Sequence, residues 1–139
     1  MKVALGIGCD RGTPLATLER AVDEALAIAG LHRGQVTGVG SITLKSDEPG
    51  LLALSAQCGW PLHFYPATQL AEVVVPHPSE IVRRHTGTPS VSEAAALLAA
   101  CTTDASALYV EKHRLRGNDG RHATVSVARV VSPLSQGNP

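Results

Sequence analysis

The sequence predicts an α/β fold: a three-layer αβα domain around a mostly parallel five-stranded mixed sheet, whose last two strands form an antiparallel hairpin. Along most of the chain, short apolar runs alternate with stretches whose apolar residues recur at helical spacing. Such alternation favours parallel strands joined by right-handed crossovers, whereas the last two strand patterns follow each other with no helix between them. We therefore expect residues 1–139 to form one domain, with 131–139 as a frayed tail.

The first half of the chain is predicted to alternate strands with helices. Thr13 and Pro14 match a helix cap followed by proline at the first helical position, and an apolar stripe then continues to Gly30. Asp47-Glu48-Pro49 opens a second helix. In chain order, we expect a strand at 2–7, a helix at 14–30, a strand at 36–42, a helix at 47–59 and a strand at 61–65.

The second half is predicted to begin with short helical segments and to end with the hairpin. Ser90 and Glu93 have the spacing of a capping box, in which each side chain bonds the backbone amide of the other. An alanine-rich helix follows them to about Cys101. The remaining elements are a helical turn at 67–71, a helix at 79–85 and strands at 105–111 and 123–130.

Composition excludes several functional classes. The 12 basic and 12 acidic residues balance, so there is no bulk electrostatic attraction to nucleic acid or to an anionic membrane. Aromatic residues make up 3% of the chain, too few for base-stacking platforms. We find no signal-peptide run, no membrane-spanning stretch, and no cysteine or histidine spacing typical of a disulfide framework or a metal site. These features predict a cytoplasmic protein without a bound metal.

Three loops are expected to meet beyond the carboxyl ends of the parallel strands, where open α/β sheets bind ligands. The first, residues 6–13, reads GIGCDRGT and could hold an anion on backbone amides at a helix start. Its glycine spacing matches neither a dinucleotide fingerprint nor a P-loop, and a tight turn without a ligand is the alternative. The candidate ligand-binding residues of this loop are Gly8, Cys9, Arg11, Gly12 and Thr13.

Cys9 carries a separate hypothesis. A thiol at a helix start beside Arg11 commonly has a lowered pKa, so Cys9 could act as a nucleophile with His113 nearby. The alternative is a structural role, which is the more usual one for a small, buried cysteine that follows a strand.

The second loop, residues 41–48, places one lysine beside two carboxylates. Lys45 could pair with a ligand carboxylate while Asp47 or Glu48 acts as a general base, so these three are the candidate catalytic residues. The alternative is that Asp47 only caps the following helix and that Glu48 only favours its first turn. The helix start does not require Lys45, which therefore remains a candidate for ligand binding in either case.

The third loop, residues 112–122, carries four formal positive charges against one negative charge. If the strand before it runs parallel to the first strand, this basic loop lies at the same end of the sheet as the glycine-rich loop. A solvated hairpin tip without a ligand is the alternative. Residues 87–90 could add a further anion site at a helix start, so the candidate ligand-binding residues here are Lys112, His113, Arg114, Arg116 and Ser90.

Four segments taken together resemble one known family. They are GIGCDRGT at 6–13, SITLKSDEPGLLALSAQCGWPLHFYPATQL at 41–70, GTPSVSEAAALLAA at 87–100 and ATVSVARV at 123–130. In this order they resemble the CobE / CbiG C-terminal domain family of cobalamin biosynthesis, and the chain looks most like its free-standing members. One departure is Glu111-Lys112, where the family usually has a Pro-Lys pair, so that Glu111 adds a negative charge at the mouth of the expected site.

The resemblance implies binding of a precorrin, a tetrapyrrole whose rim carries acetate and propionate groups. Separate cationic and amide sites at one crevice would suit such a ligand. An alternative that the family also implies is hydrolysis of a precorrin lactone with release of acetaldehyde, as in cobalt-precorrin-5A hydrolases. A third possibility is a non-catalytic scaffold for other corrin-pathway enzymes. Neither the residues nor the resemblance indicates a cofactor.

Overall fold

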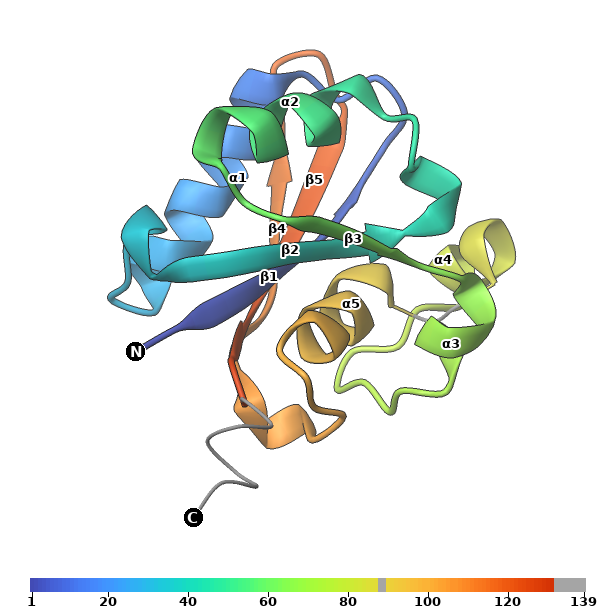
Figure 1. Cartoon of the computed structure of the whole chain (residues 1–139). Helices are drawn as coiled ribbons and strands as arrows, with labels where there is room; N and C mark the ends of the chain where they lie inside the picture. Colours follow the sequence, from blue (N-terminus) through green and yellow to red (C-terminus); the bar gives the residue numbers. More distant parts are fainter. Residues whose placement is uncertain (88–89, 132–139) are drawn as a thin grey trace.

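The computed structural model describes residues 1–87 and 90–131 and shows one five-stranded sheet in the order β3-β2-β1-β5-β4 (Figure 1). β1 pairs in parallel with β2, and β2 with β3, whereas β5 lies antiparallel between β1 and β4. β4 therefore runs parallel to β1, and only β5 runs the other way. The strands are Val3–Cys9 (β1), Val36–Ile42 (β2), Leu62–Tyr65 (β3), Leu108–Arg116 (β4) and His122–Arg129 (β5).

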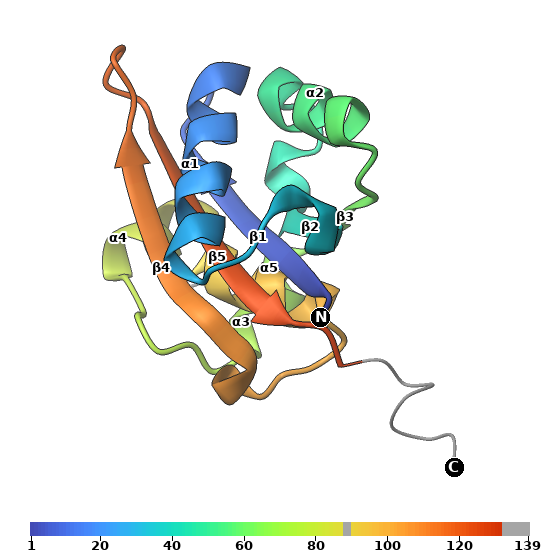
Figure 2. The same cartoon turned by 90° about the vertical axis from the view of Figure 1, so that its left-hand side faces the viewer.

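Helices cover both faces of the sheet, which confirms the predicted three-layer α/β fold. α1 and α2 lie on one face, and α5, with α3 and α4 beside it, lies on the other (Figures 1 and 2). Each face has its own apolar core, one rich in Leu and Val beneath α1 and α2 and one rich in Ala beneath α5. The helices are Leu15–Ile28 (α1), Pro49–Cys58 (α2), Ala67–Ala71 (α3), Glu80–Thr86 (α4) and Val91–Ala99 (α5), with 3-10 turns at Arg33–Gln35 (η1), Thr43–Lys45 (η2) and Ala105–Ala107 (η3).

Two adjacent glycines allow α5 to lie directly on the sheet. Gly6 of β1 and Gly40 of β2 are neighbours in the parallel ladder. A Cβ atom on Gly6 would lie 1.9 Å from the carbonyl oxygen of Ser92, and one on Gly40 would lie 2.6 Å from that of Ala95. The first glycine of the GIGCDRGT segment therefore serves helix packing and not a ligand-binding turn.

The hairpin strand β4 is longer than the sequence predicted. We expected a strand at 105–111 followed by a loop, but residues 105–107 form η3 and β4 continues to Arg116. Val110 and His113 pair with Val127 and Val125, so two residues, Glu111 and Lys112, oppose Ser126 in a β-bulge. Of the predicted third loop, only residues 117–121 form a turn, and the preceding basic residues belong to a strand.

Neither predicted helix cap forms through its side chain. Thr13 Oγ1 donates back to the carbonyl oxygen of Asp10 at 2.7 Å, and α1 begins after Pro14. Ser90 stands at the N-cap of α5 without a side-chain capping bond, and Glu93 turns instead toward His77. Apart from Val131, the predicted frayed tail lies outside the described residues. None of the helices in the described part of the chain has the length and apolar character needed to cross a membrane.

Candidate functional site

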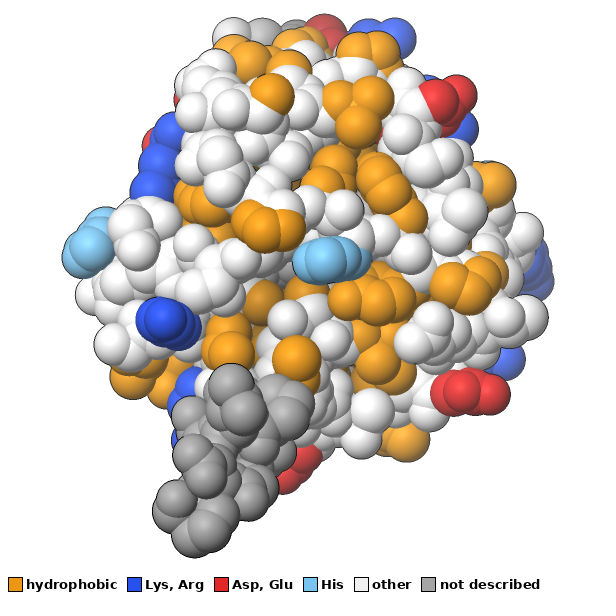
Figure 3. All heavy atoms as spheres, viewed as in Figure 1, with side chains coloured by type: hydrophobic (Ala, Val, Ile, Leu, Met, Phe, Trp, Pro, Cys, Tyr) orange, Lys and Arg blue, Asp and Glu red, His pale blue; other side chains and the backbone are white. Residues whose placement is uncertain are grey.

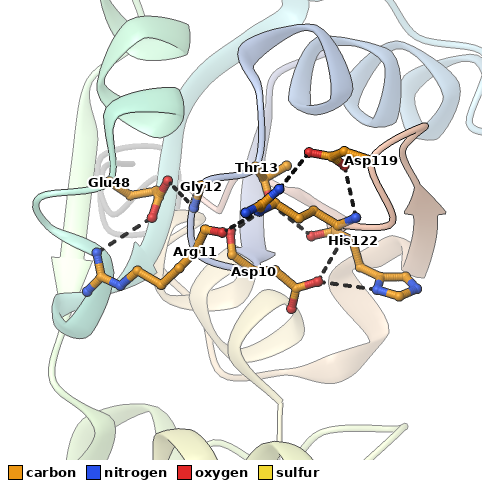
Figure 4. A network of polar contacts seen from close by, with 8 residues as sticks. Asp10, Arg11, Gly12, Thr13, Glu48, Asp119 and His122 are labelled. Atoms are coloured by element: carbon orange, nitrogen blue, oxygen red, sulfur yellow. Dashed lines mark hydrogen bonds and ion pairs between the residues drawn. The ribbon is translucent and has the colours of Figure 1, made fainter.

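The loops that follow β1, β2 and β4 meet at the carboxyl edge of the sheet, as the sequence predicted (Figure 4). Arg121, at the end of the hairpin turn, donates from Nε to the carbonyl oxygen of Arg11 at 2.8 Å. The backbone N–H of His122 donates to Asp10 Oδ2 at 2.8 Å. Residues of three loops that are far apart in the chain therefore form one connected polar network.

Glu48 occupies the anion position of the first loop. Its Oε2 accepts a hydrogen bond from the backbone N–H of Gly12 at 3.0 Å, and its side chain is 1% exposed (Figure 4). Gly12 adopts a φ of 78°, in the left-handed region that favours glycine, and this conformation presents its amide to the carboxylate. The amides of Asp10 and Thr13 are also bonded within the chain. The loop we expected to hold a ligand anion thus holds a carboxylate of the protein itself.

Arg11 joins the first loop to the second. Its guanidinium donates to Asp47 Oδ1 at 2.7 Å and to the carbonyl oxygen of Leu44 at 2.5 Å, and it lies 3.5 Å from Glu48 Oε1. The hydrogen bond from Arg11 lowers the pKa of the Asp47 carboxyl, so Asp47 is a weaker base than an unpaired aspartate. Asp47 therefore binds Arg11 and does not cap α2, whose N-cap is Glu48.

A groove of about 570 Å³ opens beside this ion pair, at the carboxyl ends of β2 and β3. Its apolar wall comes from Ile42, Leu44, Pro66 and Ala67, and its polar wall comes from Arg11, Thr43, Ser46, Asp47 and Thr86. Lys45 lies between two of these lining residues, and its side-chain ammonium forms no hydrogen bond or ion pair with another described residue.

The side chains of β4 point to different faces of the sheet. His113 packs toward α1, where its Nε2 lies 2.8 Å from Glu24 Oε1, and so it is not brought to the site. Arg114 and Arg116 alternate with it and pair with Thr124 and His122 of β5, on the face that carries α5. Both arginines are exposed, and within residues 1–87 and 90–131 their guanidinium groups form no hydrogen bond or ion pair.

Gly8 and Ser90 lie next to this arginine face. Gly8, Thr124 and Arg114 form one row across three adjacent strands. The first residue of α5, Val91, lies over the row, 3.6 Å from the position of a Cβ atom on Gly8. Ser90, immediately before it, is 1% exposed and its hydroxyl has no hydrogen-bond partner among the described residues. The amino end of α5 therefore faces the row that contains Arg114.

Lys112 is engaged in a cluster that sequence reasoning missed. Its Nζ donates to the carbonyl oxygen of His77 at 2.9 Å and lies 3.9 Å from Glu93 Oε1. Glu93 is fully buried, accepts from the backbone N–H of His77 at 3.2 Å, and leaves Oε2 without a partner among the described residues. His77 Nε2 also lies 2.8 Å from Glu111 Oε1, so the carboxylate of Glu111, which departs from the family pattern, has a hydrogen-bond partner within the protein.

Comparison with known proteins identifies the family. The family model described as cobalamin synthesis G C-terminus matches residues 3–128. The chain belongs to this family. It is 39% identical over 132 residues to Protein CobE of a Sinorhizobium species, a match that covers 94% of this chain and 73% of that protein.

Two further relatives agree with the family. The chain is 36% identical over 96 residues to a cobalt-precorrin-5A hydrolase of Priestia megaterium, which covers 69% of the chain but only 26% of that enzyme. The crystal structure of CobE, from the cobalamin (vitamin B12) biosynthetic pathway, superposes with a TM-score of 0.74 at 31% identity and covers 94% of this chain and 91% of that one. The chain is thus a cobalamin-biosynthesis protein of the CobE / CbiG C-terminal family.

Cys9 of this family member does not have the electrostatics of a nucleophile. Burial raises the pKa of its thiol to about 11, and the nearby Lys45 ammonium opposes only part of this effect. The pKa is thus raised and not lowered as we expected from the helix start.

We expect Cys9 to be alkylated far more slowly than Cys101, which is exposed. Raising a thiol pKa from 9.0 to about 11 lowers its thiolate fraction about 100-fold at neutral pH. Peptide mass spectrometry during a timed iodoacetamide reaction at about pH 8, near the pKa of an ordinary thiol, would measure both sites. Equal rates at Cys9 and Cys101 in the folded protein would contradict this picture, and a denatured sample, in which both react, serves as the control.

Proposed function

We propose that this chain binds a carboxylate-rich precorrin intermediate of cobalamin biosynthesis at the carboxyl edge of its sheet. The observation that carries the proposal is a difference in pairing among the basic residues of this edge. Arg11, Arg121 and Lys112 are bonded within the protein. The charged side-chain groups of Lys45, Arg114 and Arg116, by contrast, bond to no other residue in the described part of the chain. These three cations are available to an anionic ligand.

The chemistry of a corrin precursor fits these features. Its rim carries several acetate and propionate groups, and guanidinium groups bind carboxylates through paired, charge-assisted hydrogen bonds. The amino end of α5 adds backbone N–H groups over the row that also contains Arg114, and the positive end of a helix favours a carboxylate. The apolar wall of the groove, where Leu44 is 53% exposed, offers a surface for the ring itself.

The same geometry argues against the lactone-hydrolase alternative for this chain. A general base must reach a water molecule, yet Glu48 is buried and already accepts from Gly12. Asp47 is exposed, but its bond with Arg11 lowers its pKa and weakens it as a base. We therefore propose binding, with delivery of the intermediate to other corrin-pathway enzymes. These partners and a cytoplasmic location stay predictions.

A binding titration tests the proposal. We expect a corrinoid with free carboxylate side chains to shift in visible absorbance when the protein is added, with an affinity that falls as salt rises. Replacing both Arg114 and Arg116 with glutamine should weaken binding on the order of tenfold and reduce the salt dependence. The same ring with amidated side chains should bind more weakly.

The matched control is Arg129→Gln. Arg129 is also an exposed strand arginine, but it pairs with Val3 at the opposite end of the sheet. Its loss should leave the affinity unchanged. Equal effects of the Arg129 variant and the double variant, or no spectral shift at all, would contradict the proposed site and favour a scaffolding role.

A further inference from the structure

In the described part of the chain, the β3 edge of the sheet has no strand beside it. β3 pairs with β2 alone there, and Val39 N–H donates to the carbonyl oxygen of Pro61 at 2.9 Å in that ladder. Because backbone groups alternate in direction along a strand, those of His63 face β2 while those of Leu62 and Phe64 face outward. The outer side of β3 thus presents donors and acceptors to which no other described strand binds.

The segment that forms this edge carries no formal charge. From Pro49 to Ala71 there is no Lys, Arg, Asp or Glu, although charged residues make up 17% of the chain. This run forms α2, β3 and α3, in which β3 is the edge strand and α2 and α3 lie on opposite faces of the sheet (Figure 1). In Figure 3, which views that edge, hydrophobic side chains spread across the middle and most charged side chains lie toward the outline.

α2, next to β3 in the chain, has no charged residue on its outer face. A helix on the outside of a domain normally carries charged residues on its outer face. α2 has none, and Leu52 of this helix is 46% exposed. A surface depleted in charge and enriched in apolar side chains is typical of the centre of a protein interface.

The opposite edge shows how this chain protects a strand from pairing. β4 carries Glu111, Lys112, Arg114 and Arg116 and a bulge, and charged side chains and bulges both oppose association with another strand. β3 has neither a charged side chain nor a bulge. The prolines at positions 61 and 66 only limit a new pairing to the four residues between them.

We propose that two copies of this chain associate through β3, with the two strands antiparallel across a two-fold axis. A strand edge is self-complementary under such an axis, because the donors and acceptors of one copy face the acceptors and donors of the other. This edge favours an uncharged partner, because a charged side chain would lose its hydration there without gaining a counter-charge. The β3 edge of a second copy is equally uncharged.

The register of this pairing follows from the outward residues. Pairing Leu62 of one copy with Phe64 of the other uses the outward backbone N–H and C=O groups of both residues in each strand. This register places the two His63 residues opposite each other as a non-hydrogen-bonded pair, with Cα atoms about 4.5 Å apart. Leu52 of each copy then lies at the apolar flank of the joined sheets.

Light scattering after gel filtration tests the association over a wide dilution series. We expect twice the chain mass for the unaltered protein and the single-chain mass for a Leu52→Glu, His63→Glu double variant, in which both changed side chains are exposed. Tyr109→Glu places a charge at an exposed site on the β4 edge and should remain a dimer. Circular dichroism confirms that each variant is folded. A monomer at every concentration, or a double variant that stays dimeric, would overturn the proposal.

Oxidative cross-linking tests the register. In a Cys58→Ser, Cys101→Ser background, the His63→Cys variant should form a disulfide-linked dimer with itself, because opposed non-hydrogen-bonded residues have Cα atoms within disulfide range. The Tyr109→Cys variant, altered at the other edge, should give no such product. If the Tyr109→Cys variant cross-links and the His63→Cys variant does not, the interface lies at β4 and the inference is contradicted.

Discussion

Replacing Gly6 with alanine is expected to destabilise the fold by at least about 3 kcal/mol. The new methyl group would lie 1.9 Å from the carbonyl oxygen of Ser92 and 2.4 Å from the backbone nitrogen of Ala96. Both atoms belong to the backbone of α5, so no side-chain rotation can relieve the overlap. The helix must move off the sheet, and the alanine-rich core beneath it is then exposed.

Urea denaturation followed by circular dichroism measures this effect, and Gly38→Ala is the matched control. Gly38 is also a strand glycine of the same sheet, but a Cβ atom there would meet only the carbonyl oxygen of Pro61 at 3.7 Å, an ordinary contact. Its free energy of unfolding should stay the same or rise by up to about 1 kcal/mol, because alanine loses less chain entropy on folding than glycine. Gly40→Ala should resemble Gly6→Ala. Equal stability of the Gly6 and Gly38 variants would contradict the packing of α5.

The fold was predictable because its signals are local. Apolar periodicity located β1, β2, α1 and the helices up to α5 within a few residues, and the order of elements then implied the layers. The predicted strand for β4 ended too early, because Lys112 to Arg116 is mostly charged and resembles a loop. An edge strand exposes one long side to solvent and tolerates such residues, and only the pairing with β5 shows that they extend the sheet.

The candidate site was predictable only in part, because its decisive contacts are between distant residues. Glu48 and Glu93 both stand at helix starts, where local reasoning assigns a carboxylate to the helix end. Each is instead buried by another segment: Gly12 binds Glu48 across 36 positions, and His77 binds Glu93 across 16 positions. No spacing rule in the sequence predicts these partners.

The convergence of the loops, by contrast, followed from strand direction alone. Because β4 runs parallel to β1, the hairpin turn had to lie beside the loop that begins at Asp10. The bonds from Arg121 and His122 to that loop confirm it. Which basic residues remain unpaired at this edge could not be read from their order in the chain, because that depends on the internal acceptors that the fold brings close.

Glu48→Ala should lower the free energy of unfolding by about 2–4 kcal/mol. The substitution removes a fully buried carboxylate, leaves the N–H of Gly12 without its acceptor, and opens a gap between the first loop and α2. Asp47→Ala removes the shorter contact, 2.7 Å to Arg11, yet it should change stability little because both partners are exposed and solvated. The ranking of the two variants is thus set by burial and not by distance.

Glu48→Gln separates the two contributions of this side chain and tests its role. The amide oxygen can still accept from Gly12, so this variant should recover part of the stability that the alanine variant loses, while the attraction to Arg11 is lost. Thermal denaturation of the three variants should give the order Asp47→Ala, Glu48→Gln, Glu48→Ala from most to least stable. If Glu48 serves to hold the first loop against the start of α2, corrinoid affinity should follow that same order. A Glu48→Ala protein as stable as the unaltered chain would instead identify the carboxylate as a group retained for chemistry, since a buried charge that adds nothing to stability requires another reason to be there.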